Sequence, residues 1–301
     1  MREISITEIE NVKIGSAEDM DARTGCTVVI CEQGAPTGVD VRGGGPASRE
    51  TELLSQQATC DKVHAVLLSG GSAFGLDAAG GVMEYLENKG VGLPVGNAIV
   101  PLVCQSCIFD LLVGKNIRPD KEMAKRACEA AELNAPKSGR VGAGAGATVG
   151  KLLGPEFSMD SGLGIYAVQL GELKVGAVVA VNASGDVIDF ESGEIIAGLL
   201  SDDKTGFRDS EKTLYELAEM QPGNTTIGVI ITNAKFDKSR MTKVAQMAQD
   251  GYARSLRPVH TTMDGDTVYA MSVGSVESNV DLVGTLAARV MAAAIRNAVR
   301  S

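Results

Sequence analysis

The chain has 301 residues, of which 44% are hydrophobic and 22% charged, a composition that excludes a disordered chain and a coiled coil. This length is enough to bury the core of one enzyme-sized α/β domain. The net charge of -10 and the lack of a dense block of Lys and Arg disfavour nucleic acid and anionic membrane surfaces as partners.

Neither export nor membrane insertion is predicted. The first eight residues lack the basic start and apolar run of a signal peptide, and the most apolar late segment carries Asp281, Arg289 and Arg296. We therefore expect a cytoplasmic protein whose cysteines are reduced. The chain has two histidines, His64 and His260, which are too few for a metal centre built from several histidines.

The first half of the chain alternates short strand-like runs with glycine turns. Strands are predicted at 25–31, 37–41 and 64–68, followed by a helix over 76–89 that ends at Gly90. Gly80 and Gly81 inside this helix indicate close packing against a sheet. A second helix is predicted from its N-cap, Asp120, to about residue 133.

Cys104 and Cys107 form a CxxC pair inside the apolar run 99–112. A structural zinc site needs four ligands, and the chain has no second CxxC to complete one. We therefore interpret both cysteines as small core residues.

A glycine-rich stretch at 139–150 precedes Lys151. It has a superficial likeness to a phosphate-binding loop, but Ala145 and Leu152 stand where a Walker motif needs Gly and Ser or Thr. We interpret these glycines as close backbone packing around an active site. The runs 163–170 and 173–181 then predict a hairpin, with Asn182 at the turn that ends its second strand.

The last third of the chain begins with an exposed connector at 201–224 that contains a short polar helix. The β-branched run 225–232 predicts a strand buried on both faces, followed by a helix over 237–255, a strand over 266–273 and a helix over 280–299. Because strands and helices interleave without a regular βαβ period, the order favours a layered α/β sandwich over a Rossmann sheet or a barrel.

The junction between connector and strand reads Gly223-Asn224-Thr225-Thr226. Such a sequence is typical of a turn followed by a strand. A Thr hydroxyl can also attack the preceding peptide bond when the local backbone is strained. The freed α-amine, with an unperturbed pKa of about 7.7 to 8.0, can then act as general base for its own hydroxyl. This chemistry suits a chain with few histidines, but the residues at the junction alone do not select it.

Six segments in order along the chain resemble the DmpA/NylC-type self-processing hydrolases, which are N-terminal-nucleophile amidases and aminopeptidases. The segments are 41–45, 68–76, 142–151, 179–182, 223–234 and 260–270. Two of these segments contain motifs, Gly-Asn-Thr-Thr at 223–226 and Asp-Gly-Asp at 264–266, that are most similar to the nylon-oligomer hydrolase branch. The D-aminopeptidase and β-peptidyl aminopeptidase branch has a nucleophilic Ser instead.

The resemblance implies an αββα sandwich of the DmpA/ornithine-acetyltransferase type. It also implies that a single hydrolase domain, 1–301, is cut between Asn224 and Thr225 into an α chain, 1–224, and a β chain, 225–301. Amide bonds of small peptides or oligoamides would be hydrolysed through an acyl-enzyme ester on Thr225. The same likeness implies a homo-oligomer of processed chain pairs and no metal or organic cofactor.

Four further residues acquire catalytic roles by the same resemblance. Asn182 would donate to the oxyanion, a contribution of roughly 2.7 to 4 kcal/mol per donor, and Lys151 would supply positive charge near the nucleophile. Asp264 and Asp266 would orient and polarise the Thr225 amine and hydroxyl, and their separate roles stay open.

By spacing alone, Asp264 and Asp266 would lie on one face at the start of a strand and share a hydrogen-bond network. Without the resemblance they would be interpreted as a solvated turn. His260 is expected to form hydrogen bonds behind the site rather than to act as its acid or base, and His64 is expected to be structural.

Two alternatives stay open. In an acyltransferase of the ornithine-acetyltransferase type, the ester would pass its acyl group to an amine, although Asn224 and the Asp264–Asp266 segment favour the hydrolase. In a non-catalytic, unprocessed paralogue, the fold would serve as a binding protein. The sequence does not indicate whether a substrate is an L-, D- or β-peptide or an oligoamide.

Overall fold

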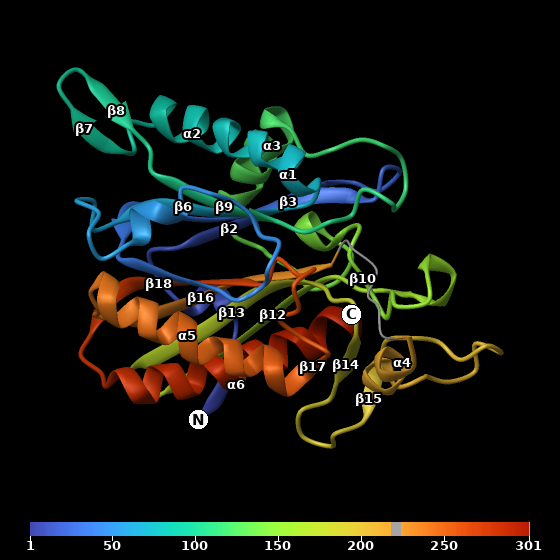
Figure 1. Ribbon diagram of the computed structural model, residues 1–301. Helices are drawn as coiled ribbons and strands as arrows, with labels where there is room; N and C mark the ends of the chain where they lie inside the picture. The colour runs from blue at the N-terminus through green and yellow to red at the C-terminus, as the bar shows by residue number, and fades with distance from the viewer. Residues whose placement is uncertain (218–223, 301) are drawn as a thin grey trace.

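Two β-sheets packed face to face form the centre of the computed structural model, which describes residues 1–217 and 224–300. One pair of helices covers the outer face of each sheet (Figure 1). The order of layers is therefore helix, sheet, sheet, helix, which confirms the predicted αββα sandwich.

The first sheet has six strands in the order β1-β12-β13-β16-β18-β4 and is antiparallel except for the parallel pair β16 and β18. Its two central strands come from the parts of the chain on either side of the connector. The strands are β1 (Arg2–Ile4), β4 (Thr37–Val41), β12 (Leu163–Leu170), β13 (Leu173–Asn182), β16 (Thr225–Ala234) and β18 (Thr267–Val276).

The second sheet has five strands in the order β2-β3-β6-β9-β5, with β6 and β9 parallel. Its strands are β2 (Lys13–Asp19), β3 (Thr24–Ala35), β5 (Ala47–Arg49), β6 (Val63–Ser69) and β9 (Val103–Cys107). Three small sheets extend the framework. They are formed by β7 (Leu93–Val95) with β8 (Ala98–Val100), by β10 (Thr148–Val149) with β11 (Met159–Asp160), and by β14 (Asp186–Ile188) with β15 (Ile195–Ala197) and β17 (Leu256–Arg257).

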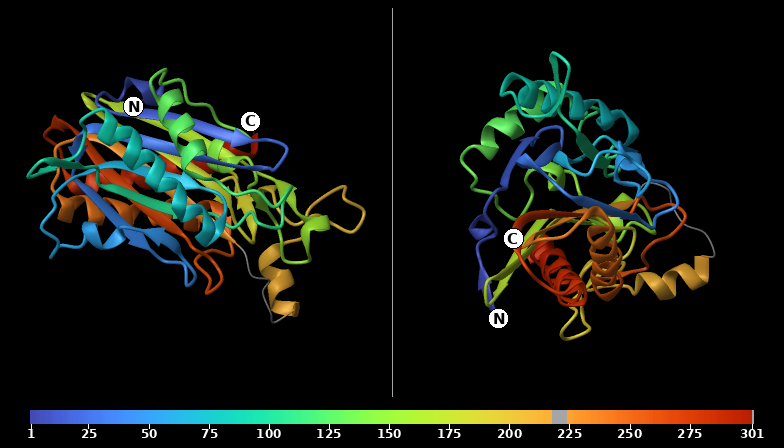
Figure 2. Two further views of the ribbon diagram at one scale, coloured as in Figure 1. Left: turned by 90° about the horizontal axis from the view of Figure 1, so that it is seen from above. Right: turned by 90° about the vertical axis from the view of Figure 1, so that its left-hand side faces the viewer.

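The helices of the outer layers are α2 (Ala79–Asn88) and α3 (Lys121–Ala131) over the second sheet, and α5 (Lys238–Ser255) and α6 (Val280–Arg300) over the first. Asp120 and Asp237 cap α3 and α5 by accepting hydrogen bonds from backbone amides of the first turn, as N-cap residues do. Two shorter helices, α1 (Ser72–Gly75) and α4 (Ser210–Leu217), lie in connections, and α4 lies outside the four layers (Figures 1 and 2).

Three hydrophobic cores match the three interfaces between layers. One lies between the first sheet and α5 and α6, one between the two sheets, and one between the second sheet and α2 and α3. Because side chains alternate along a strand, β16 sends residues to two of these cores. Ile230 and Ala234 face the helices, whereas Ile227, Val229 and Ile231 lie between the sheets.

The predicted helix over 76–89 differs from the structure in two respects. A short 3-10 helix over Leu76–Ala78 precedes α2, so the α-helix begins later than expected. Gly80 and Gly81 face the start of α3 rather than a sheet, because a Cβ on Gly81 would lie 2.1 Å from the carbonyl oxygen of Lys121. The predicted end at Gly90 is confirmed, since this residue has φ +70° and follows the last turn.

Among the described helices, α6 alone has the length and apolar composition of a membrane span. Two thirds of its most apolar window is buried within the protein, where Ala294 and Ala298 pack over Gly164 of β12. A Cβ at Gly164 would lie 1.8 Å from the carbonyl oxygen of Ala294. Packing of helix on sheet therefore accounts for the apolar composition of α6.

Candidate active site

Thr225 is the first residue of β16 and pairs with Asn182, the last residue of β13. The alternation along β16 places its side chain on the same face as Ile227, in the space between the two sheets. Its exposed fraction is 3%. The hydroxyl therefore lies at the end of a central strand, on the inner face of the sheet.

The Thr225 hydroxyl donates a hydrogen bond to the carbonyl oxygen of Asn224, the residue before it, and accepts one from the Gly265 amide at 3.1 Å. A Cβ at position 265 would lie 2.8 Å from the Thr225 hydroxyl oxygen, so glycine permits this close approach. Asn224 is also buried. The Thr225 hydroxyl thus contacts the carbonyl of the peptide bond that is predicted to break. The Gly265 N–H is directed at the hydroxyl oxygen.

The Asn182 side chain connects three segments. Its Oδ1 accepts hydrogen bonds from the Thr148 amide at 3.1 Å and the Lys151 amine at 2.8 Å. Its Nδ2 donates to the carbonyl of Phe109 at 3.1 Å. The structure therefore brings Asn182 beside Thr225, with one of its two amide N–H groups bound to Phe109.

Lys151 follows Gly150, which has φ +72° and packs against the backbone of Gly198. Its Nζ donates to both the carbonyl and the Oδ1 of Asn182, at 2.9 and 2.8 Å. Burial of the amine lowers the pKa of Lys151 to about 7, although the charges of Asp264 and Asp110 oppose the shift. The structure therefore places the Lys151 amine on Asn182, in surroundings that favour its neutral form more than water does.

Asp264 lies in the turn before β18 and is buried. Its Oδ2 accepts hydrogen bonds from the amide and the hydroxyl of Thr261, both at 2.7 Å. Burial, and then the charge of Asp266, raise the pKa of Asp264 to about 6, while the Thr261 donors and Lys151 act in the opposite direction.

Asp266 has different partners. Its Oδ1 accepts from the Thr226 amide at 2.8 Å, and its Oδ2 accepts from the His260 amide at 3.1 Å and lies 3.0 Å from His260 Nδ1. The expectation of one shared hydrogen-bond network on a strand is thus wrong, because β18 begins only at Thr267. The turn that precedes Gly265 folds the Asp264 carboxylate back onto Thr261 instead.

The glycine segment 43–45 holds this turn in place from the other side. The amide of Gly44 donates to the carbonyl of Thr261 at 3.1 Å, and the amide of Gly45 donates to that of Asp264 at 2.8 Å. A Cβ on Gly43 would lie 2.3 Å from the Asp264 carbonyl oxygen. Glycine at 43 is therefore required for the loop to lie against the two aspartates.

Sequence reasoning missed Asp110, a buried carboxylate that follows β9. It accepts hydrogen bonds from the Thr24 hydroxyl at 2.6 Å and the Gly71 amide at 2.7 Å, and burial raises its pKa. A Cβ on Gly70 would lie 2.0 Å from its Oδ2. The Gly70–Gly71 pair was the available signal, since adjacent glycines indicate a backbone that another group approaches closely.

Two interpretations from the sequence are confirmed. Cys104 and Cys107 are free thiols in the interior, and burial raises the pKa of each to about 12. The glycine-rich stretch is close backbone packing, since Cβ atoms on Gly144 and Gly146 would each lie 2.0 Å from another backbone atom. This packing brings the Thr148 amide and Lys151 to Asn182.

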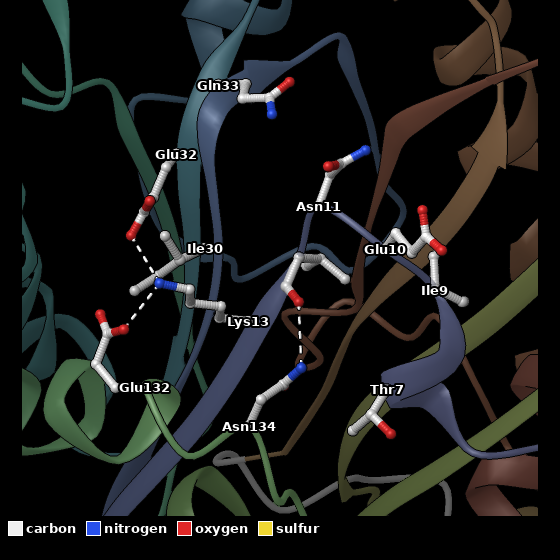
Figure 3. A pocket seen from close by; sticks show the side chains of 11 residues that line it. Thr7, Ile9, Glu10, Asn11, Lys13, Ile30, Glu32, Gln33, Glu132 and Asn134 are labelled. Carbon is white, nitrogen blue, oxygen red and sulfur yellow. Dashed lines mark hydrogen bonds and ion pairs between the residues drawn. The ribbon is translucent and has the colours of Figure 1, made fainter.

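A cavity of about 420 Å³ lies elsewhere, beside β2 and the end of α3, and contains none of the predicted site residues (Figure 3). In it, Lys13 bridges Glu32 and Glu132 at 2.9 and 2.8 Å, and Asn134 donates to the carbonyl of Val12. Because these groups are paired with one another, the cavity indicates no ligand.

Sequence comparison relates the chain to one family of peptidases and amide hydrolases. The sequence profile of peptidase family S58 matches residues 5–301. An uncharacterised aminopeptidase of Mycobacterium leprae is 39% identical over 91% of this chain and 80% of its own length. The 6-aminohexanoate-oligomer endohydrolase of Paenarthrobacter ureafaciens is 32% identical over 92% of this chain and 77% of its own length.

Solved structures show the same fold. The L-aminopeptidase D-Ala-esterase/amidase of Ochrobactrum anthropi, described as a variant of the Ntn hydrolase fold, superposes with a TM-score of 0.73 at 13% identity over 97% of this chain and 85% of that one. A β-aminopeptidase of a Burkholderia species superposes with a TM-score of 0.69 at 20% identity over the same fractions.

Proposed function

Since the chain belongs to peptidase family S58 and is a hydrolase that acts on amide bonds, we propose that it cuts itself between Asn224 and Thr225 and then uses Thr225 as its nucleophile. The observation that supports this most is the position of the Thr225 hydroxyl, between the Asn224 carbonyl and the Gly265 amide. Both residues of the bond to be cut are held at the start of a strand buried on both faces.

In the first reaction, the Thr225 hydroxyl attacks the carbonyl carbon of Asn224. The C–N bond breaks, an ester forms on the Thr225 oxygen, and the nitrogen becomes the free α-amine. Water then hydrolyses the ester and leaves a carboxylate on Asn224. Lys151, which contacts Asn182 beside Thr225, and Asp264, which adjoins Gly265, are the nearby ionisable groups whose pKa values are moved toward neutrality.

In the second reaction, the α-amine of Thr225 takes the proton from its own hydroxyl while the oxygen attacks a substrate amide. The acyl-enzyme ester is hydrolysed by water. The second N–H of the Asn182 amide is the donor that we assign to the oxyanion, and such a donor contributes roughly 2.7 to 4 kcal/mol.

The uncut chain is closed to substrate. Thr225 and Asn224 each have an exposed fraction of 3%, so an external amide has little access to the hydroxyl before cleavage. We therefore expect uncut protein to be inactive toward added amides, and activity to appear in step with cleavage.

Substrates are expected among peptides and oligoamides, the classes named for the aminopeptidase and endohydrolase relatives. A screen of processed protein against aminoacyl p-nitroanilides, D-amino-acid amides and 6-aminohexanoate oligomers identifies the preferred class. Adding amine acceptors to the same assay separates hydrolysis from acyl transfer, because an acyltransferase would form amide products in preference to free acids.

Intact-mass analysis of the wild type and of Thr225→Ala and Thr225→Ser tests the proposal. The wild type should give a fragment that begins at Thr225, Thr225→Ser should still cut because it keeps a hydroxyl, and Thr225→Ala should stay intact and inactive. Cleavage of Thr225→Ala at the same bond would overturn the proposed nucleophile.

A further inference from the structure

The imidazole of His260 is linked to the nucleophile's strand through one carboxylate. His260 Nδ1 lies 3.0 Å from Oδ2 of Asp266, and the His260 backbone amide donates to the same oxygen at 3.1 Å. The other oxygen of Asp266 accepts from the Thr226 amide at 2.8 Å. Because a carboxylate oxygen accepts hydrogen bonds, we assign the donor role in this contact to Nδ1–H.

This linkage reaches Thr225 through its backbone. The Asp266 carboxylate accepts from the Thr226 amide, whereas the Thr225 hydroxyl contacts the Asn224 carbonyl and the Gly265 amide. His260 and Asp266 therefore fix the Thr225–Thr226 peptide plane and leave the hydroxyl to its contacts with Asn224 and Gly265.

Two features of His260 are uncommon in a folded chain. Its φ of +58° lies in the left-handed region, which few residues other than glycine adopt, although His, Asn and Asp do so more often than the rest. Its Nε2 is buried and has no hydrogen-bond partner among the described residues. The ring is held by stacking on Tyr252, with centroids 6.0 Å apart. Strained backbone and unpaired buried polar atoms concentrate at functional sites.

We propose that His260 is a positioning residue: its Nδ1–H holds the Asp266 carboxylate on the Thr226 amide, and this fixes Thr225 for attack in both cleavage and turnover. The inference rests on the proposed function, because His260 acts only by positioning Thr225 for its two reactions. Asp266 transmits the effect to the nucleophile.

Three substitutions separate the donor from the backbone. His260→Asn puts an N–H donor near the position of Nδ1 and tolerates positive φ. His260→Gly tolerates the same φ but has no donor, and His260→Gln puts its donor near the position of Nε2. His64→Asn is the matched control, because His64 contacts the Leu102 amide and no residue of the site among the described contacts.

The cleavage rate is measured as the appearance of the fragment that begins at Thr225. The kcat and KM of each processed variant and its thermal unfolding are then measured. We expect His260→Gly and His260→Gln to lower the cleavage rate and kcat by about ten- to a hundredfold, the range for losing a hydrogen bond to a charged group, with little change in KM. His260→Asn should recover most of the rate, and His64→Asn should match the wild type.

Equal rates for His260→Gly and the wild type would overturn the inference. Equal rates for His260→Gly and His260→Asn would also overturn it, because the two variants share a tolerance of positive φ and differ in the N–H donor. If His260→Gly does not fold, a rate of His260→Asn close to that of the wild type supports the inference, and a rate of His260→Asn as low as that of His260→Gln overturns it. If wild-type protein neither cuts nor hydrolyses amides, the proposed function fails first, and the role of His260 fails with it.

Discussion

Lys151 and Asp264 are ionisable groups of opposite charge whose pKa values are both moved toward neutrality. Burial lowers the pKa of Lys151 to about 7 and raises that of Asp264 to about 6, and each attracts the other's charge. Groups with such pKa values gain and lose protons at the pH of the cell, as an acid or a base in catalysis must. The protonation of single residues is therefore expected to set the pH dependence of this protein.

Self-cleavage should slow as the pH falls through about 6, because Asp264 then becomes protonated and loses its negative charge beside the site. The rate is measured between pH 5 and 8 as the appearance of the fragment that begins at Thr225. In Asp264→Asn, cleavage should be slow at every pH and the acid limb should disappear. An acid limb unchanged in Asp264→Asn would assign it to another group.

The stability of the uncut protein should rise with pH between about 7 and 10 because of Lys151. The folded protein releases the Lys151 proton near pH 7, whereas an unfolded Lys keeps it to about 10.4. The unfolded state thus binds more protons in this range, so the free energy of unfolding increases with pH, by up to several kcal/mol.

Urea unfolding at pH 7, 8.5 and 10 checks this, in a Thr225→Ala background that keeps the chain intact. Lys151→Met in the same background should remove most of the rise, because no buried amine is left to titrate. Equal slopes with and without Lys151 would contradict the lowered pKa.

At the scale of elements, the site depends on backbone segments that approach one another more closely than side chains permit. The glycine segment 43–45 lies against the turn 260–266, and the stretch 142–150 lies against β3 and the start of β12. Strands β13 and β16 then place Asn182 and Thr225 in register. Glycine at the contact positions therefore controls the geometry of catalytic residues that lie on other elements.

Gly43→Ala and Gly45→Ala form a matched pair for this effect. A Cβ at 43 would lie 2.3 Å from the Asp264 carbonyl oxygen, whereas one at 45 would have its nearest neighbour at 3.7 Å, an ordinary contact. Gly43→Ala should cost about 1 to 3 kcal/mol of stability and slow self-cleavage, and Gly45→Ala should stay close to the wild type. Thermal unfolding and the cleavage rate measure both effects, and indistinguishable variants would argue against close packing here.

At the scale of the whole molecule, the proposed cut separates two chains that share one sheet. The chain 225–301 supplies β16 and β18 in the middle of the first sheet and both helices beneath it, while the chain 1–224 supplies the strands on either side. Cleavage of one bond removes none of these contacts. The site stays assembled only if the two chains stay together.

Processed protein should therefore elute as a single species in native size-exclusion chromatography and separate into two chains only in denaturant. Separate elution without denaturant would contradict the shared sheet. Light scattering on the same column measures the assembly and tests the predicted homo-oligomer of chain pairs, while the cytoplasmic location remains a prediction from the sequence.

The sequence by itself determined the elements whose signals are local. The β-branched run at Thr225, the N-cap Asp120, and the hairpin around Gly171 all form where they are predicted, because periodicity, capping and turn preference act over a few residues. The order of strands and helices favoured a layered sandwich, and the resemblance to a family added its αββα type and a set of candidate residues that composition alone does not select.

Only the tertiary structure decided how these residues meet. The pairing of Asn182 with Thr225, the separate partners of Asp264 and Asp266, and the approach of Asp110 depend on strand order and on contacts between segments far apart in the chain. The pKa of Lys151 has the same origin, since burial is a property of the assembled layers and not of the local sequence.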